Sequence, residues 1–304
     1  MFLFFIIIIG ILIYLQYYLS SCENFTNSIP KYNKIIDNND NIYDEFYSKL
    51  YSKLFPTAIK IKYEINDIKT NAIIPYINND STSTIKILDI GCGLGDHVKV
   101  LSDLEYDVIG IDKSADMIKS GKLKYNLRDK YLQCNDALID NIYNKNTFSH
   151  ILCMYFTYYY FKEPKHILNN IHKWLKPDGY FVVHLVNRNK FDPILEASSP
   201  FPAFSKQKYT KNRITQSDII FNNINYSSNF TINEKENRGY LTETFISKNN
   251  DYHRKQTHTL YMSDHEEIVN YIKTYGFQLV HMSHLLDVEY EYQYLYYFKC
   301  LKPN

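Results

Sequence analysis

Three aspartates and a cluster of glycines between residues 89 and 136 are the residues whose types and spacing best suit chemistry. Asp89 lies in one apolar run, Asp112 ends the next one, and Asp136 follows a third. A carboxylate can accept hydrogen bonds from both hydroxyls of a ribose, or from the exocyclic amine of a base. Each aspartate alone could be a helix cap or a solvated turn residue. Three of them at successive strand ends instead predict a nucleoside site, with Asp112 at the ribose and Asp136 at the base.

The glycine cluster lies directly beside the first of these aspartates. Three of the nine glycines of the chain fall within residues 91–95, between an apolar run and a helical pattern. A strand, a glycine turn and a helix in this order aim free amides at a polar ligand and let it approach the main chain. The dinucleotide fingerprint Gly-x-Gly-x-x-Gly is not met, because Asp96 stands where its third glycine is expected. A nicotinamide-dependent oxidoreductase is therefore the weaker alternative.

The elements that must position these residues alternate between strands and helices. Apolar runs predict strands over residues 85–90, 107–111, 131–135, 150–154 and 180–184, with helical patterns between most of them. This alternation predicts an α/β fold with a doubly wound, mostly parallel sheet, whose ligand lies at the carboxyl ends of the strands. Toward the end of the chain, a helix is expected over residues 264–275 and strands over 277–284 and 293–300.

Four motifs together resemble those of class I S-adenosylmethionine-dependent methyltransferases. They are ILDIGCGLG (87–95), VIGIDKS (108–114) followed by Met117, NDA (135–137) and WLKPDGY (174–180). The resemblance spans about residues 85–186. It implies a seven-stranded sheet with an antiparallel last strand, S-adenosylmethionine as the cofactor, and methyl transfer as the activity.

The resemblance also implies roles for individual residues of these motifs. Asp89, Gly91 and Gly93 would lie at the methionine part of the cofactor and Asp112 at the ribose. Asp136 and Ala137 would lie at the adenine, and Met154 near the sulfonium. The complete set of expected cofactor-binding residues is Asp89, Gly91, Cys92, Gly93, Asp112, Lys113, Asp136, Ala137 and Met154.

Candidate catalytic residues follow from the chemistry of methyl transfer. A sulfonium donor is already activated, so the protein aligns a nucleophile and, where needed, accepts its proton. His184, at the end of one expected strand, and Tyr158 and Tyr159, in the aromatic run after another, are candidates. His184 could instead be a hydrogen-bonded strand residue, and the tyrosines could be packing residues in a chain with 30 Tyr. The Asn/Asp-Pro-Pro-Tyr signature of base amino-methylases does not occur there, so that class is not expected.

Residues 187–262 interrupt the methyltransferase pattern and are expected to form a substrate lid. Alternating polar and apolar residues over 224–232, 240–247 and 253–262 predict a three-stranded antiparallel meander. A basic cluster precedes it and is either a solvated loop or a contact to an acidic or phosphorylated substrate. Its members are Lys206, Lys208, Lys211 and Arg213.

The N-terminal segment differs in kind from the rest of the chain. Only Gly10 and Gln16 interrupt the apolar residues from 2 to 19, a length that as a helix would cross a bilayer. Residues 1–22 are therefore predicted to be a single-pass transmembrane anchor, with a cleaved or lipidated segment as the alternative. Lys31 and Lys34 follow the span, which favours a cytosolic position for the remaining chain. Residues 23–80 are expected to form a tether, up to about residue 44, and two helices over 43–54 and 58–74, ahead of a methyltransferase domain over 81–302.

Composition restricts the classes of partner. With 34 Lys plus Arg against 33 Asp plus Glu, the net charge of +1 disfavours nucleic-acid binding. Five cysteines without a Cys-x-x-Cys pair argue against a disulfide framework or a zinc ribbon. No metal is expected, since His253, His258 and His265 lack matching ligands. The methyl acceptor, a small molecule or a protein side chain, stays open, and a membrane-tethered binding module without turnover is the alternative function.

Overall fold

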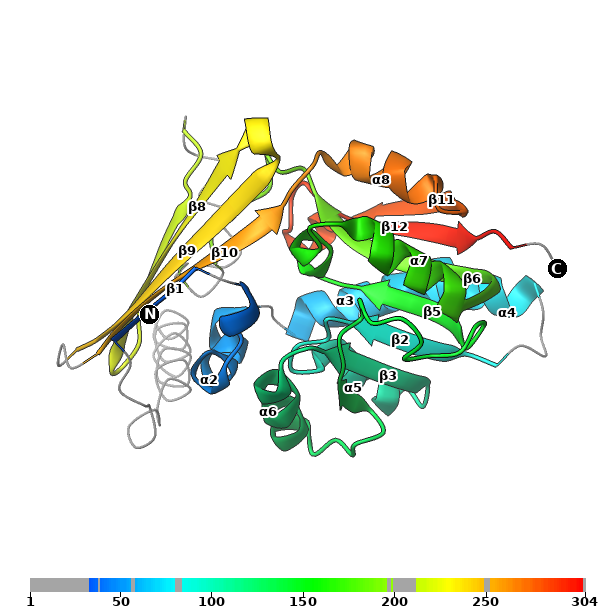
Figure 1. Cartoon of the computed structure of the whole chain (residues 1–304), viewed down its shortest axis with the longest axis horizontal. Helices are drawn as coiled ribbons and strands as arrows, with labels where there is room; N and C mark the ends of the chain where they lie inside the picture. Colours follow the sequence, from blue (N-terminus) through cyan, green and yellow to red (C-terminus); the bar gives the residue numbers. More distant parts are fainter. Residues whose placement is uncertain are drawn as a thin grey trace, which may run out of the picture.

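The computed structural model describes residues 33–37, 39–55, 58–79, 84–195, 198, 212–248 and 252–302, which form two β-sheets side by side (Figure 1). The larger sheet has seven strands in the order β11-β12-β6-β5-β2-β3-β4. Strand β12 runs antiparallel to both of its neighbours, and the other pairings are parallel. This confirms the predicted doubly wound, mostly parallel sheet with an antiparallel last strand. Its strands are β2 (Lys86–Ile90), β3 (Asp107–Asp112), β4 (Leu132–Cys134), β5 (Phe148–Cys153), β6 (Leu175–Val186), β11 (Phe277–His284) and β12 (Gln293–Cys300).

Helices cover both faces of this sheet because its central strands are apolar on both sides. In β5, Ile151 packs toward α7 and α8, whereas the next residue, Leu152, packs toward α3 and α5. Two separate hydrophobic clusters result, one on each face. The helices are α3 (Ala58–Ile68), α4 (Ile74–Asn79), α5 (Asp96–Asp103), α6 (Ala115–Tyr125), α7 (Pro164–Trp174) and α8 (His265–Lys273).

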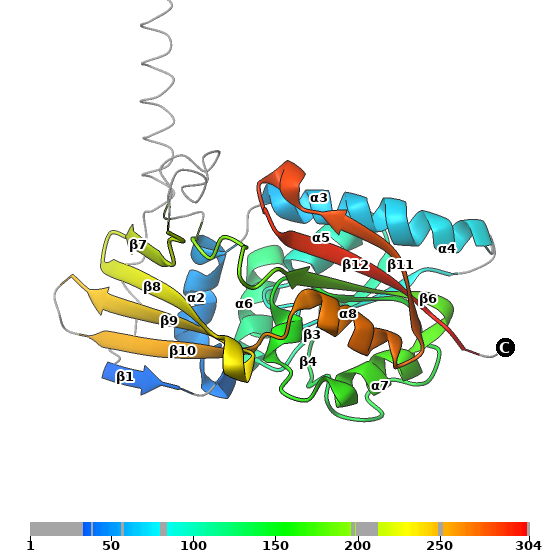
Figure 2. The ribbon, with the colours of Figure 1, turned by 90° about the horizontal axis from the view of Figure 1, so that it is seen from above.

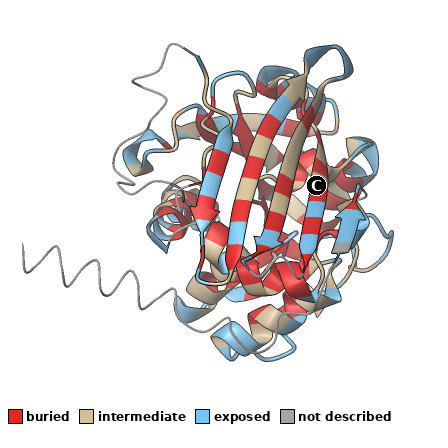
Figure 3. Cartoon of the chain, turned by 90° about the vertical axis from the view of Figure 1, so that its left-hand side faces the viewer, coloured by how far each residue is buried: buried red, intermediate tan, exposed pale blue. Residues whose placement is uncertain are grey.

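The smaller sheet has five strands in the order β1-β10-β9-β8-β7. Buried and exposed residues alternate along its strands, so one face is polar and the other packs inward (Figure 3). The predicted meander is confirmed as the antiparallel strands β8, β9 and β10. Two further strands, β1 and β7, were not predicted. The strands are β1 (Asn33–Ile36), β7 (Gln216–Ile220), β8 (Ile224–Asn233), β9 (Arg238–Ser247) and β10 (His253–Tyr261).

Helix α2 (Glu45–Leu54) lies between the smaller sheet and α6 (Figure 2). It begins where the Asp44 side chain accepts a hydrogen bond from the Tyr47 amide, as an N-cap does. Phe46 and Leu50 pack against the smaller sheet, while Ser48 contacts Ser120 of α6 across 2.8 Å. The predicted helix at 43–54 is thereby confirmed, and it joins the two halves of the molecule.

The predicted tether is wrong for residues 33–36. These residues form β1, which pairs parallel to β10 at the edge of the smaller sheet. Four residues are too few to show an alternating pattern, and the free edge of β10 supplies the missing hydrogen-bonding partners. Asn39 then fastens the chain, because its side chain exchanges hydrogen bonds with the backbone N–H and C=O of Thr259 at 2.9 and 2.7 Å. The second predicted helix is confirmed as α3, which continues through a π-helical turn, Lys69–Ile73, into α4.

Some predictions concern residues that the structure does not describe. The expected transmembrane anchor at residues 1–22 lies outside the described ranges, as do Lys206, Lys208 and Lys211 of the basic cluster. Within the described part of the chain, no helix combines the length and apolar character needed to cross a bilayer.

Candidate active site

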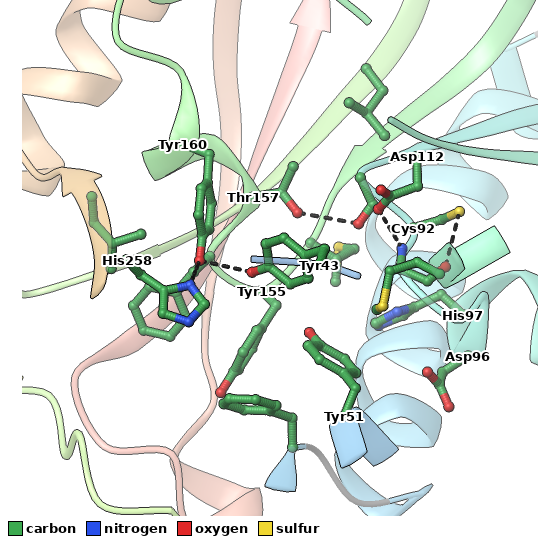
Figure 4. Close-up of a pocket in the computed structure, with 18 of the residues that line it drawn as sticks. Tyr43, Tyr51, Cys92, Asp96, His97, Asp112, Tyr155, Thr157, Tyr160 and His258 are labelled. Carbon is green, nitrogen blue, oxygen red and sulfur yellow. Dashed lines mark hydrogen bonds between the residues drawn. The ribbon is translucent and has the colours of Figure 1, made fainter. Parts of the chain in front are cut away.

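A cavity of about 270 Å³ lies where the carboxyl ends of β2, β3, β4 and β5 face the smaller sheet (Figure 4). Two groups of residues line it. We call the first the strand-end wall: Asp89, Gly91, Cys92, Gly93, Asp112, Lys113, Asp136, Ala137 and Met154. We call the second the aromatic wall: Tyr43, Tyr47, Tyr51, Phe55, Tyr160, Phe191, Phe230 and His258.

The strand-end wall contains all nine residues that the sequence predicted to bind a cofactor. The structure therefore brings that whole set together on one side of one cavity. Its floor is the glycine turn after β2, where Gly91 and Gly93 have φ angles of +65° and +57°. A Cβ on Gly91 would stand 2.4 Å from Cγ2 of Thr157, so no side chain fits there. The bare backbone of the turn can consequently make close contact with a ligand.

Asp89 is the most unusual member of this wall. Its side chain is 1% exposed, and neither carboxylate oxygen has a hydrogen-bond partner in the described structure. Burial raises the pKa of Asp89 to about 7. A buried carboxylate without partners, facing a cavity, fits a ligand that brings a hydrogen-bond donor or a positive charge.

The other two aspartates are held in place by backbone amides. Asp112 accepts hydrogen bonds from the N–H groups of Gly93 and Ser114, both at 2.9 Å. Asp136 accepts from the Leu138 N–H at 2.9 Å. These bonds orient the carboxylates and leave further acceptor positions on their oxygens.

The structure corrects the three catalytic candidates, because none of them lines the cavity. His184 is buried in β6, where its Nδ1 donates to the Tyr155 carbonyl at 2.6 Å and its Nε2 lies 3.0 Å from the Gln293 side chain. Burial lowers the pKa of His184 to about 4. Tyr158 and Tyr159 point into the core. The 3₁₀ turn Thr157–Tyr160 directs its outer residues, and not its middle ones, toward the cavity.

The aromatic wall contains a chain of hydrogen bonds that the sequence did not predict. The Tyr43 hydroxyl donates to the Tyr160 oxygen at 2.8 Å, and the Tyr160 hydroxyl lies 2.7 Å from Nδ1 of His258. Nε2 of His258 lies 2.6 Å from a carboxylate oxygen of Glu243. Glu243 is fully buried and also accepts from the Tyr226 hydroxyl at 2.7 Å. Figure 4 shows Tyr160 between Tyr43 and His258.

A second carboxylate–histidine pair lies on another side of the same cavity. His97, from the first turns of α5, lies 2.8 Å from the buried Glu64 of α3. Glu64 also forms a buried ion pair with Lys60. Burial opposes ionisation of Glu64, but Lys60 and His97 outweigh it and hold the pKa of Glu64 at about 2. Burial likewise opposes protonation of His97, yet the hydrogen bond to Glu64 raises the pKa of His97.

One signal in the sequence points to the missed residues. Arg254, Gln256 and His258 alternate along β10, and all three face the buried side of the sheet. Polar residues at successive inward positions of a strand are costly unless they are paired, so they mark a functional or structural network. Glu243 is the register partner of Gln256 on β9. The tyrosines carry no such signal in a chain that holds 30 of them.

The segment of the chain that contains the strand-end wall is similar to known proteins. Residues 88–183 match the family model described as "Methyltransferase domain". A ubiquinone biosynthesis O-methyltransferase of Rickettsia prowazekii (strain Madrid E) is 28% identical over 135 residues, which cover 43% of this chain and 52% of that protein. Phosphoethanolamine N-methyltransferase 3 of Arabidopsis thaliana is 28% identical over 109 residues, 32% of this chain and 20% of that protein. The chain thus spans about half the length of the first of these relatives, and less of the second.

Solved structures share the fold over most of the chain. An S-adenosylmethionine-dependent methyltransferase from Clostridium acetobutylicum ATCC 824 superimposes with a TM-score of 0.59 at 16% identity, covering 84% of this chain and 96% of that one. The CcbJ methyltransferase from Streptomyces caelestis gives a TM-score of 0.62 at 14% identity, covering 87% and 100%. At these identities the likeness concerns the fold.

Proposed function

We propose that the chain is a class I S-adenosylmethionine-dependent methyltransferase and that it methylates a hydroxyl or amine of a small, largely apolar molecule. The observation that carries the proposal is the single cavity shared by the strand-end wall and the aromatic wall. A nucleophile held at the aromatic wall would face the cofactor directly, as an in-line displacement requires.

The strand-end wall fits S-adenosylmethionine by the chemistry of its side chains. Asp89 offers an unpaired buried carboxylate to the cationic amino group of the methionine part. Asp112 keeps acceptor positions for the two ribose hydroxyls, and Asp136 keeps one for the adenine amine. Bound there, the cofactor supplies an activated methyl group on a sulfonium.

The aromatic wall supports a small acceptor with an apolar body. A cavity of about 270 Å³, part of which the cofactor would occupy, suits a small molecule better than a folded protein segment. Apolar side chains dominate the acceptor side, and they favour an uncharged or aromatic skeleton. They are Leu54, Phe55, Phe191, Leu195, Phe230, Leu241 and Leu260.

Calorimetry and a transfer assay on the full-length protein test this function. We expect S-adenosylmethionine and its demethylated product to bind, NAD not to bind, and tritium from the methyl group to enter a small molecule in fractionated host metabolites or lipids. Binding without transfer to any fraction would support a binding module instead. If neither S-adenosylmethionine nor its demethylated product binds, the proposal as a whole is contradicted.

We also propose that residues 1–22 hold the protein in a membrane by a single pass, with the methyltransferase domain on the cytosolic face. The apolar stretch from 2 to 19 and the following Lys31 and Lys34 support this. The full-length protein should stay with membranes after alkaline carbonate extraction, and protease should reach the domain only from the cytosolic side. Release of the chain by carbonate would contradict the anchor.

A further inference from the structure

We propose that Tyr43, Tyr160, His258 and Glu243 form a proton relay that takes the proton from a hydroxyl nucleophile during methyl transfer. This inference rests on the proposed function and deepens it, because it identifies the acceptor atom as a hydroxyl oxygen. It also gives a catalytic task to residues that come from three separate parts of the chain: the start of α2, the turn after β5, and the strands β9 and β10.

The hydrogen bonds of the relay run in one direction. Ionised Glu243 can only accept, so Nε2 of His258 carries the hydrogen of their 2.6 Å bond. Nδ1 of the neutral ring then accepts from the Tyr160 hydroxyl at 2.7 Å. The Tyr160 oxygen accepts in turn from Tyr43 at 2.8 Å. What is left is a lone pair on the Tyr43 oxygen at the cavity, where a hydroxyl of the acceptor can donate.

Tyr43, the first member of the relay, lies next to the strand-end wall. Its backbone carbonyl accepts a hydrogen bond from the Ser114 hydroxyl, and Ser114 is the residue whose N–H holds Asp112. The first member of the relay is thus fastened to the loop that would bind the ribose. This contact keeps Tyr43 and the strand-end wall at one cavity, where an acceptor hydroxyl would lie beside both (Figure 4).

Glu243 acts through His258 and is a positioning residue, since it does not line the cavity. Burial works against its ionisation, but the charge that His258 carries when protonated, and the hydrogen bonds from His258, Tyr226 and Gln256, lower the pKa of Glu243. The resulting anion stabilises the imidazolium that forms when His258 takes a proton. The other polar groups facing the ring are Tyr47 of α2 and Gln256 of β10, at 3.5 and 3.4 Å from Nε2.

The step balances in atoms and charge. The acceptor oxygen bonds to the methyl carbon while the carbon–sulfur bond breaks and its electron pair stays on sulfur. The acceptor proton passes to the Tyr43 oxygen, the Tyr43 proton to Tyr160, and the Tyr160 proton to Nδ1 of His258. One sulfonium charge is lost and one imidazolium charge is gained, beside Glu243.

A relay of this kind suits a hydroxyl better than an amine. A neutral amine attacks with its lone pair and can release a proton to water afterwards. A hydroxyl that attacks without losing its proton becomes a strongly acidic oxonium, so a positioned base lowers the barrier. The other histidine of the cavity is less suited. His97 shares Glu64 with the cation Lys60, and its ring is not joined to a tyrosine hydroxyl within the described chain.

Tyr160→Phe tests the relay because it removes the central hydroxyl and keeps the ring. We expect the affinity for S-adenosylmethionine to stay unchanged and kcat to fall about 100-fold with phenols that are neutral in solution. With 2,4-dinitrophenol, which is already ionised at neutral pH, the loss should shrink to a few-fold. Tyr158→Phe, the neighbouring tyrosine that does not line the cavity, is the matched control and should keep the wild-type rate.

A readout without turnover accompanies the assay. In protein with ¹⁵N-labelled histidine and bound demethylated product, His258 should show the Nε2–H tautomer, and Tyr160→Phe should shift its Nδ1 resonance. Glu243→Gln should weaken that tautomer preference. An Nδ1–H tautomer, or a Tyr160→Phe enzyme as fast as the wild type with neutral phenols, would overturn the relay. Transfer to amines alone would also overturn it, whereas a wild-type protein that binds no adenosyl ligand would contradict the proposed function instead.

Discussion

The two walls of the cavity are assembled in different ways. In the strand-end wall, contacts join residues close in the sequence: Gly93 donates to Asp112, 19 residues away. In the aromatic wall, they join distant segments: Tyr43 donates to Tyr160 and Tyr160 contacts His258, at separations of 117 and 98 residues. The first wall is thus a property of consecutive strand–helix units. The second wall forms only when helix α2 and the smaller sheet pack together. A substitution that disturbs this packing should therefore alter the acceptor side of the cavity and leave the cofactor side intact.

Arg254 gives the largest expected effect, because it fastens the aromatic wall. Its guanidinium is fully buried, contacts both carboxylate oxygens of Asp44 at 2.8 Å, and donates to the Ile42 carbonyl at 2.8 Å. Arg254→Met removes the buried cation from the Asp44 carboxylate that caps α2, and it removes one of the hydrogen bonds that the Ile42 carbonyl accepts. We expect the free energy of unfolding, measured by denaturant titration, to fall by about 3 kcal/mol.

Arg238 supplies the matched control on the neighbouring strand. It pairs with Glu236 at 3.3 Å on the surface, where solvent screens the charges. Arg238→Met should leave the unfolding midpoint nearly unchanged. If both variants lose the same free energy of unfolding, the comparison fails, because the aromatic wall would then not depend on the contact between Arg254 and Asp44.

Asp112 provides the corresponding test of the strand-end wall. Asp112→Ala removes the carboxylate expected at the ribose and should weaken S-adenosylmethionine binding by about 1 to 3 kcal/mol in calorimetry. Asp107→Ala, at the opposite end of the same strand β3, removes an exposed carboxylate and should not change the affinity. If a folded Asp112→Ala protein keeps the wild-type affinity, the assignment of the ribose to this wall is wrong.

The pH dependence of S-adenosylmethionine binding tests the role of Asp89 in the strand-end wall. Burial raises the pKa of Asp89 to about 7, so below that pH the side chain is increasingly protonated and neutral. A cationic amino group then loses its counter-charge, and S-adenosylmethionine affinity should fall by up to about tenfold per pH unit below pH 7. Calorimetry between pH 5.5 and about 8 measures this. Asp89→Asn should bind weakly across the whole range and lose the slope, and a slope that persists would assign the proton to another group.

The same contrast explains what could be predicted from the sequence. The seven strands of the larger sheet, the glycine turn and the three acids are predicted from apolar runs and turn residues, because each signal sits within a few residues of the element it positions. The other members of the strand-end wall follow from the family resemblance of the motifs. The edge strand β1 and the pairing of Tyr43 with Tyr160 depend on docking between segments far apart in the chain. His258 could be suspected from the polar alternation on β10, but its partner across the cavity could not.

Substitutions in the tyrosine run after β5 have the smallest expected effects. They test which of these tyrosines belong to the aromatic wall. The Tyr158 hydroxyl is buried without a hydrogen-bond partner in the described structure, so Tyr158→Phe should change the free energy of unfolding by less than about 0.5 kcal/mol. Tyr159 accepts from the Val186 N–H at 2.8 Å, and Tyr159→Phe should cost about 1 kcal/mol. Neither change should alter kcat, because both hydroxyls face the core. A Tyr158→Phe protein that stays as stable as the wild type but transfers methyl groups slowly would extend the aromatic wall to a residue that the geometry leaves out.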